Sequence, residues 1–388
     1  MRVGNAIYMD YQSTTPLDPA AREVMLPFIG NMFGNPHSSS HRFGWEAEAA
    51  VDVARGHVAR LLDVDPAQVF FTSGATESNN MAIKGLALGR QDTPGRIITV
   101  ATEHSCVLES ALASAAFGHE PVILPVQPNG LLDLDVLEAA LTDDTVLVSV
   151  MAVNNEIGVI QPLEEIAALA KARGIALHCD AAQAFGKLPV ETLAAQCDLI
   201  SLSGHKIYGP KGIGALYVKA DIQRKLAPHM SGGGQEGHLR SGTLAPALCA
   251  GFGKAAEVAA QGLEQEMARA RRHFTQLMDG LEAMDGTFHL NGCEDQRLKS
   301  NINVSFEGTD SARLMANLRR LAVSSGAACA SAKEGPSYVL EALGVPPGLA
   351  EASLRIGTGR FTDDAQVADA LSYIEDALAK SRKRTWSK

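Results

Sequence analysis

The sequence predicts an α/β fold in which a mainly parallel β-sheet is covered by helices on both faces and is followed by a smaller α/β unit. From about residue 69 to residue 203, short apolar segments alternate with segments of helical periodicity. This alternation is typical of a parallel sheet that is buried on both faces. After about residue 251 the pattern changes to a long amphipathic helix and a second set of strands and helices. The second set predicts a separate, smaller unit.

The elements of the first unit follow one another from a long N-terminal helix. Residues 36–62 predict a polar loop that enters this helix. Its apolar stripe is expected to contain Trp45, Ala49, Val53, Val58 and Leu62. Residues 69–88 predict a strand, a Ser-Gly turn and a helix. Further strands are expected at 97–100, 122–126, 145–150, 175–180 and 199–203, with helices between most of them, such as 163–174.

The second unit begins with a long helix whose apolar residues recur at helical spacing. They are Leu263, Met267, Ala270, Phe274, Leu277 and Leu281. A strand at 302–306 and helices at 311–321 and 364–381 are expected to follow. We therefore predict a large domain at 16–255 and a small domain at 256–388, which residues 1–15 complete.

Composition narrows the class of protein. A net charge of −10 argues against nucleic-acid binding as the main function. No apolar segment approaches the roughly 20 residues that cross a membrane, and the first residues lack the apolar core of a signal peptide, so a cytoplasmic enzyme is expected. The six cysteines form no CxxC pair, which favours reduced thiols over a structural zinc site or a redox dithiol.

The ends of the predicted strands are the places to look for a site, because ligands bind beyond the carboxyl ends of parallel strands. After the strand at 199–203, a glycine-rich turn contains Ser203, His205 and Lys206. A lysine in this setting can form a Schiff base. Taken alone, however, this stretch slightly favours a solvated loop lysine at position 206.

Asp180 ends the preceding strand, with Gln183 three residues further on. A carboxylate at an apolar strand end is costly unless it meets a positive partner, and a protonated pyridine nitrogen is such a partner. An aspartate for the pyridinium and a lysine for the Schiff base are the two protein groups that pyridoxal 5′-phosphate (PLP) requires. The two strands are consecutive, so Asp180 and Lys206 together predict a PLP site.

Three other strand ends carry polar residues with two possible roles. The turn at 72–80 offers Ala75 and Thr76 as a phosphate cradle or as an ordinary helix cap. His104 can stack on a flat cofactor and move protons, or it can be a core histidine. Asn154 and Asn155 can bind a substrate carboxylate or simply make a turn.

Several long motifs resemble group I cysteine desulfurases, which belong to the class V aminotransferase family of fold-type I PLP enzymes. They are FTSGATESNN, DAAQAFGKLP, SGHKIYGPKGIGALYV and SSGAACASAKEGPSYVLEALG, and the resemblance extends from MDYQSTTPLDP to LRIGTGRFTD, nearly the whole chain. It implies a mixed, mainly parallel seven-stranded sheet and a small domain that carries a catalytic-cysteine loop. It also implies removal of sulfur from L-cysteine to give L-alanine and a persulfide, for iron–sulfur cluster assembly and possible tRNA thiolation.

The resemblance assigns roles to individual residues. Lys206 would hold PLP and shuttle protons, and His104 would stack on the ring as an acid–base group. Asn155 and Arg355 would bind the substrate carboxylate. The cofactor site implied by the resemblance comprises Ala75, Thr76, His104, Asn155, Asp180, Gln183, Ser203, His205, Lys206 and Thr243 of the partner subunit. This last contact implies a homodimer with shared active sites.

Cys329 would be the nucleophile. Its surroundings are small and polar, which favours an exposed loop that can carry sulfur to a scaffold or other acceptor protein. Only a thiolate is nucleophilic, and either His104 or the bound substrate can promote its formation. No resident metal is expected, although Cys329 can be considered as a transient iron–sulfur ligand. The chain departs from the family pattern at Ala327 and Ala330, where Ser or Thr is common, and at His238, where glycine is common.

The remaining expectations concern partners and rival functions. Docking of a scaffold through a C-terminal extension is in doubt, because the chain ends soon after Leu378. No membrane partner and no direct nucleic-acid partner are expected. The rival enzymes are a selenocysteine lyase and an aminotransferase of the same fold, and the rival from another class is a sulfur-transfer or scaffold protein that has lost PLP.

Overall fold

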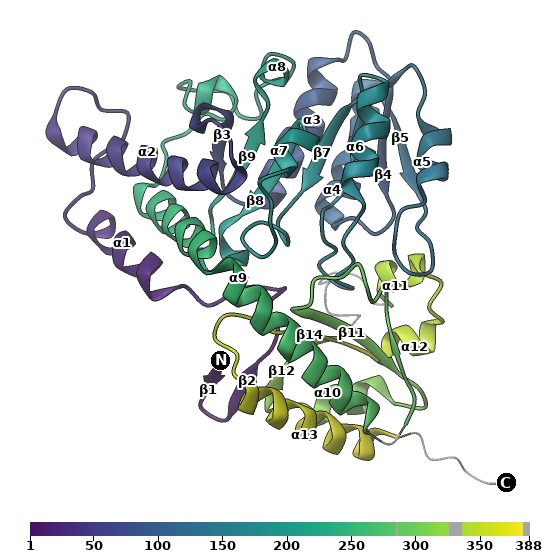
Figure 1. Ribbon diagram of the computed structural model, residues 1–388. Coiled ribbons are helices and arrows are strands. Elements are labelled where there is room, and N and C mark those ends of the chain that lie inside the picture. Colours follow the sequence, from purple (N-terminus) through teal and green to yellow (C-terminus); the bar gives the residue numbers. More distant parts are fainter. Residues whose placement is uncertain (285, 326–335, 383–388) are drawn as a thin grey trace.

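The computed structural model describes residues 1–284, 286–325 and 336–382, and its centre is a seven-stranded sheet. The strand order is β3-β9-β8-β7-β6-β4-β5 (Figure 1). Strand β9 runs in the direction opposite to the other six strands. The predicted mixed, mainly parallel sheet is therefore confirmed. The strands are β3 (Val69–Thr72), β4 (Arg96–Val100), β5 (Glu120–Leu124), β6 (Thr145–Ser149), β7 (Ala176–Asp180), β8 (Leu199–Ser203) and β9 (Gly214–Val218).

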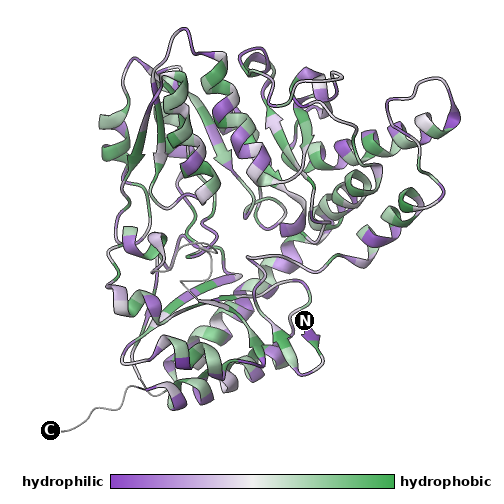
Figure 2. Ribbon diagram, turned by 180° about the vertical axis from the view of Figure 1, so that it is seen from behind, coloured by the Kyte–Doolittle hydropathy of each residue, from purple (hydrophilic) through white to green (hydrophobic). Residues whose placement is uncertain are grey.

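Helices bury both faces of this sheet. Because successive side chains of a strand point to opposite faces, Phe70 packs in one hydrophobic cluster and Phe71 in the other. One face is covered by α2, α5, α6 and the first half of α9, and the other by α3 and α4. Figure 2 shows the strands of this sheet as mainly hydrophobic, which follows from burial on both sides. The helices of this part are α1 (Pro19–Ile29), α2 (Arg42–Leu62), α3 (Ala75–Gly89), α4 (Ser105–Ala113), α5 (Leu134–Ala140), α6 (Leu163–Ala172), α7 (Leu193–Gln196) and α8 (Ala220–Gln223).

A second hydrophobic core lies around a smaller antiparallel sheet of order β10-β11-β14-β13. Ile7 and Met9 from the N-terminal segment pack in this core. Helix α9 (Pro246–Glu282) contributes to both cores, through Phe252 in the large one and Leu277 in the small one. No observation tests the domain division at residue 255, which stays a prediction. The elements are β1 (Arg2–Val3), β2 (Ala6–Tyr8), β10 (Phe288–Leu290), β11 (Asn301–Phe306), β12 (Leu321–Ala322), β13 (Ser324–Ser325), β14 (Ser353–Gly357), α10 (Ser311–Asn317), α11 (Tyr338–Ala342), α12 (Pro347–Glu351) and α13 (Asp364–Ser381).

Several predicted elements end earlier than expected, and two of them have a clear physical cause. Strand β5 stops at Leu124 because Pro125, which follows it, has no N–H for the ladder. Helix α10 stops at Asn317, and the last residue of the predicted helix instead begins β12, which pairs with β2. In the second case, pairing with the N-terminal segment replaces helical hydrogen bonds.

The predicted apolar stripe of α2 is partly wrong. Trp45, Ala49 and Val53 are exposed, although Val58 and Leu62 are buried as expected. The buried face carries small residues instead, because α9 approaches so closely that a Cβ on Gly253 would lie 2.4 Å from the Cα of Ala54. The larger apolar side chains are therefore left on the outer face of α2.

In the part of the chain that the structure describes, none of the helices combines the length and the apolar character that a membrane span requires.

Candidate active site

Polar residues from four neighbouring strands meet at one edge of the large sheet. Strands β8, β7, β6 and β4 lie side by side and parallel, so their carboxyl ends share an edge. His104 follows β4, Asn155 follows β6, Gln183 follows β7 and Lys206 follows β8. The sheet thus brings together residues that are distant in the sequence.

The N-terminal segment joins Lys206 to Gln183. Lys206 Nζ donates hydrogen bonds to the carbonyl oxygens of Gln12, at 2.6 Å, and Ser13, at 2.7 Å. Gln183 Nε2 donates to the same Gln12 carbonyl at 2.8 Å. Sequence reasoning did not identify Gln12, because its contribution is a backbone carbonyl group, which any residue type can supply.

Asp180 is a buried carboxylate at the end of β7. Its Oδ1 accepts a hydrogen bond from the Ala182 backbone N–H at 2.9 Å, and its Oδ2 accepts one from Asn79 Nδ2 at 2.7 Å. Within the described residues it makes no ion pair. A buried carboxylate that lacks a cation is costly. The protonated pyridine nitrogen of PLP would supply that cation, so the site fits the cofactor.

A short hydrogen-bonded chain connects Asp180 to His104. Besides its bond to Asp180, Asn79 Nδ2 donates to Cys106 Sγ at 3.2 Å, and Cys106 Sγ lies 3.0 Å from His104 Nδ1. The same Nδ1 accepts the Cys106 backbone N–H at 3.2 Å, as the N-cap of α4. Because a backbone N–H can only donate, Nδ1 is an acceptor and the proton of the neutral ring is on Nε2.

Within this hydrogen-bonded series, the pKa values of His104 and Cys106 differ from their usual values. Loss of water around the ring lowers the pKa of His104, and the charge of Lys206 lowers it further, whereas Asp180 opposes the change. Burial raises the pKa of Cys106 to about 12. His104 is therefore neutral at physiological pH, and Cys106 is a thiol and not a thiolate.

The N-terminus of α3 lies at the turn for which a phosphate cradle or an ordinary helix cap was predicted. Gly74 precedes the helix and no side chain caps it, so the cradle stays a prediction that the backbone N–H groups of the first turn could serve. Gly74 and Gly214 approach so closely that a Cβ on Gly214 would lie 2.7 Å from the Cα of Gly74. Glu77, in the first turn of α3, pairs with Arg240 at 2.7 Å. This ion pair ties the segment that carries Thr243 to the cradle.

Two predicted phosphate ligands, Ser203 and His205, lie at the carboxyl end of β8 and just after it. Ser203 is buried at the strand end, and His205 Nδ1 lies 3.0 Å from Thr14 Oγ1. Burial lowers the pKa of His205 to about 4, and the charges of Lys206 and Lys211 add to this effect. His205 is accordingly a neutral hydrogen-bonding group.

Arg355 and Asn155, the two residues predicted to bind the substrate carboxylate, contact each other. Arg355 Nη1 donates to the Asn155 carbonyl oxygen at 3.1 Å. Its Nη2 contacts Asp10 Oδ1 at 2.8 Å and Ser324 Oγ at 3.0 Å. Asn154 has the other role considered for it, because its Oδ1 accepts the backbone N–H groups of residues 156 and 157 and so forms the turn.

Five further positions were singled out in the sequence. Thr243 is exposed, and in the described part of the chain no hydrogen bond joins it to the other site residues. His238 adopts φ 66°, a left-handed conformation that favours glycine, which agrees with the glycine that is common there. Ala327, Cys329 and Ala330 lie outside the described residues. The role of each predicted site residue stays a prediction.

Asn79 provides a test of the Asp180 environment. Replacing Asn79 with alanine removes a 2.7 Å donor to a buried carboxylate, which is worth about 1.5–3 kcal/mol. We expect PLP to bind about 10-fold more weakly or worse, as measured by absorbance titration of the cofactor-free enzyme. Asn80→Ala is the matched control, because among the described residues the side chain of Asn80 bonds only the Thr76 carbonyl. This change should alter PLP affinity little.

Comparison with known proteins places this site in a family. The model of the aminotransferase class-V family matches residues 7–369. The cysteine desulfurase IscS of Rickettsia bellii (strain OSU 85-389) is 49% identical over 376 residues, which are 97% of this chain and 92% of that relative. A solved NifS-like protein is 33% identical with a TM-score of 0.89, covering 98% of this chain and 100% of that one. SspA, solved in complex with cysteine, is 36% identical with a TM-score of 0.82, covering 92% of this chain and 99% of that one.

The chain therefore belongs to the class-V aminotransferases, PLP-dependent enzymes of fold type I. Within them it belongs to the cysteine desulfurases.

Proposed function

We propose that this enzyme removes sulfur from L-cysteine, releases L-alanine and keeps the sulfur as a persulfide on Cys329. The observation that carries the proposal is the meeting of Asp180, a buried carboxylate without a cation, with Lys206 at one sheet edge. Asn155 follows the neighbouring strand β6, and Arg355, from β14 of the small sheet, contacts its backbone carbonyl. The Arg355 guanidinium is suited to the carboxylate of an amino acid. The 49% identity to a cysteine desulfurase supports the choice of substrate.

Each of the site residues would have a separate role in this reaction. Bound PLP supplies an electron sink for chemistry at the substrate Cα. Asp180 would pair with the pyridinium nitrogen, and Gln183 would contact the ring hydroxyl. Lys206 would hold the cofactor and move a proton at Cα. His104 would stack on the ring and exchange protons through Nε2, because Nδ1 is engaged by the Cys106 backbone.

The sulfur transfer itself would belong to Cys329. Its thiolate attacks the sulfur of the bound cysteine, so a sulfur–sulfur bond forms. The Cβ–Sγ bond of the substrate breaks, and its electron pair stays with the carbon, which is protonated to give alanine. No external oxidant or reductant is needed.

Product analysis separates this reaction from that of an aminotransferase. With L-cysteine as the sole substrate, the PLP-loaded enzyme should form alanine over many turnovers when a thiol reductant removes the persulfide. An aminotransferase would need a 2-oxo acid acceptor, and it would form alanine only if that acceptor were pyruvate. Alanine that forms only when a 2-oxo acid is added would disprove the proposal. Comparison of kcat/KM for L-cysteine and L-selenocysteine tests the selenocysteine lyase alternative.

We also propose that the enzyme is a homodimer in which Thr243 reaches the phosphate of the partner subunit's cofactor. Six large apolar side chains are exposed on α1, α2 and the segment between them, and we call them the α1–α2 surface. An apolar patch of this kind marks an interaction site. Phe33 and Phe43 stack on each other with ring centroids 5.5 Å apart while remaining exposed. The six are Leu26, Ile29, Phe33, Phe43, Trp45 and Val53.

Charges placed on this surface should break the dimer. We expect Phe33→Asp with Trp45→Asp to give a folded monomer in light scattering, because two carboxylates would be buried in an apolar interface. Leu112→Asp is the matched control, since Leu112 is an exposed apolar residue on α4. A wild-type monomer, or a double variant that remains dimeric, would contradict the proposed interface.

The persulfide sulfur is proposed to serve iron–sulfur cluster assembly and tRNA thiolation through acceptor proteins. The support is the resemblance to group I cysteine desulfurases and the similarity to IscS of Rickettsia. The measurement is transfer of ³⁵S from the labelled enzyme to a purified iron–sulfur scaffold protein. Retention of all the label on the enzyme would count against this role.

A further inference from the structure

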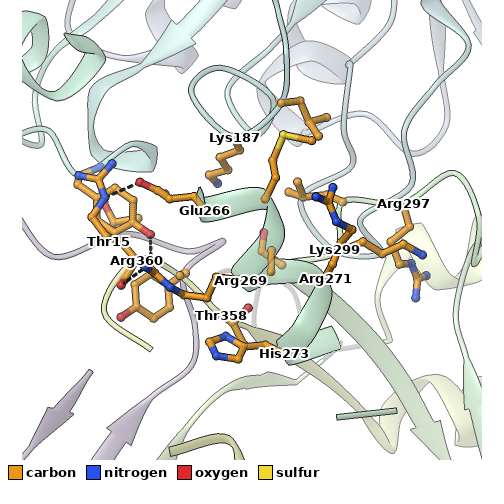
Figure 3. A pocket seen from close by; sticks show the side chains of 18 residues that line it. Thr15, Lys187, Glu266, Arg269, Arg271, His273, Arg297, Lys299, Thr358 and Arg360 are labelled. Carbon is orange, nitrogen blue, oxygen red and sulfur yellow. Dashed lines mark hydrogen bonds and ion pairs between the residues drawn. The ribbon is translucent and has the colours of Figure 1, made fainter. Parts of the chain in front are cut away.

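A cavity of about 230 Å³ lies between the two cores, apart from the site described above. It is bordered by α9 at 266–273, the turn at 187–188, the segment at 297–300 before β11 and the segment at 358–360 after β14 (Figure 3). None of the residues that we assign to PLP or to the substrate lines it. The cavity is therefore a separate candidate site.

The wall of this cavity is strongly cationic, although the chain carries a net charge of −10. The carboxylate of Glu266 pairs with Arg360 at 2.6 Å, and Arg360 also pairs with Asp18 at 2.5 Å, so the positive excess of the wall comes from the other basic residues. His273 adds no charge, because burial lowers the pKa of its imidazole. The lining cations are Lys187, Arg269, Arg271, Arg297, Lys299 and Arg360.

Five of these cations, all except Arg360, make no ion pair with a carboxylate among the residues that the structure describes. Where they make hydrogen bonds, the acceptors are uncharged. Lys187 Nζ donates to Gln183 Oε1 at 2.6 Å, Arg269 Nη1 to the Arg360 carbonyl at 2.8 Å, and Lys299 Nζ to the Glu294 carbonyl at 2.7 Å. Within the described residues, no direct ion pair therefore offsets their positive charges around this cavity.

Two of these basic residues are strongly desolvated. Arg297 is only 3% exposed, and burial lowers its pKa to about 10. Burial and the nearby charge of Lys206 lower the pKa of Lys187 to about 7. Crowded, desolvated cations of this kind are stabilised by an anion placed among them.

Much of the remaining wall is apolar or aromatic, and Thr15, Ser300 and Thr358 add hydroxyl groups. The apolar and aromatic part is formed by Tyr11, Leu188, Tyr208, Met267, Ala270 and Leu298. Apolar walls with a few convergent charged groups are typical of sites for small organic ligands. We propose that this cavity binds a small organic anion with an apolar or aromatic body, at a site separate from the PLP and cysteine site.

Binding of phenyl phosphate to the PLP-loaded enzyme tests this proposal by calorimetry at low salt. Inorganic phosphate offers the charge alone, and benzyl alcohol offers the ring alone. We expect phenyl phosphate to bind with a Kd about tenfold or more below that of either fragment, since it uses both parts of the wall. Saturating L-alanine, the reaction product, should leave this Kd unchanged.

Paired charge removals locate the site. Arg271→Ser with Lys299→Ser should weaken phenyl phosphate binding by about tenfold or more. Lys171→Ser with Arg224→Ser removes two exposed cations outside the cavity and should have less than about a twofold effect. Circular dichroism and Tm of both double variants establish that they are folded. No binding to the wild type, equal effects of the two double variants, or competition by L-alanine would each overturn the proposal.

Discussion

Replacing Cys329 with alanine is expected to abolish formation of alanine from L-cysteine, with a loss of roughly 10³-fold or more in kcat. Activity should be lost because no other group in the proposed mechanism can accept the substrate sulfur. PLP binding should be unchanged, since Cys329 is assigned no contact with the cofactor. The measurement is alanine released by PLP-loaded enzyme, with PLP content determined on the same sample.

Cys293→Ala serves as the control for this result. Cys293 is a free, partly exposed cysteine that belongs to none of the proposed machinery, so its removal should leave activity near that of the wild type. If the Cys329 variant retained full alanine production, the persulfide mechanism would be wrong and an aminotransferase-like reaction would be favoured instead.

Replacing Lys206 with alanine should remove the covalent attachment of PLP and lower kcat by roughly 10³-fold or more. Lys206 Nζ is held by two backbone carbonyls at 2.6 and 2.7 Å, close to His104 and Gln183. No other lysine is expected to replace it. Borohydride reduction followed by intact-mass measurement checks the attachment, because reduction fixes PLP irreversibly on the wild type.

Lys211→Ala is the matched control, because Lys211 is an exposed lysine in the same glycine-rich segment. It should keep both the reduced PLP adduct and the activity. A PLP adduct that persists in the Lys206 variant and maps to another lysine would show that the cofactor lysine has been misassigned.

The sequence was informative where function depends on residues that directly follow strands. The alternation of strands and helices predicted the sheet, and the carboxyl-end rule then pointed to Asp180 and Lys206. The contributions of Gln12 and Asn79 could not be predicted in this way. The first acts through a backbone carbonyl, and the second reaches Asp180 from a helix of another βα unit, a contact that only the packing of α3 on the sheet creates.

Helix α2 shows a second limit of structure prediction from the sequence. Periodicity finds an apolar stripe, but it does not say whether the same chain or another chain covers it. The small residues Ala47, Val51 and Ala54 face α9, while Trp45 and Val53 are exposed. The close approach of α2 to α9 required small side chains, so the larger ones were left for the proposed dimer interface.

Mass spectrometry of the PLP-loaded enzyme after incubation with L-cysteine tests the central claim most directly. Peptide mapping without reductant should find one additional sulfur atom on Cys329. An adduct on Cys106 or Cys293, or turnover without any adduct, would contradict the proposed persulfide mechanism.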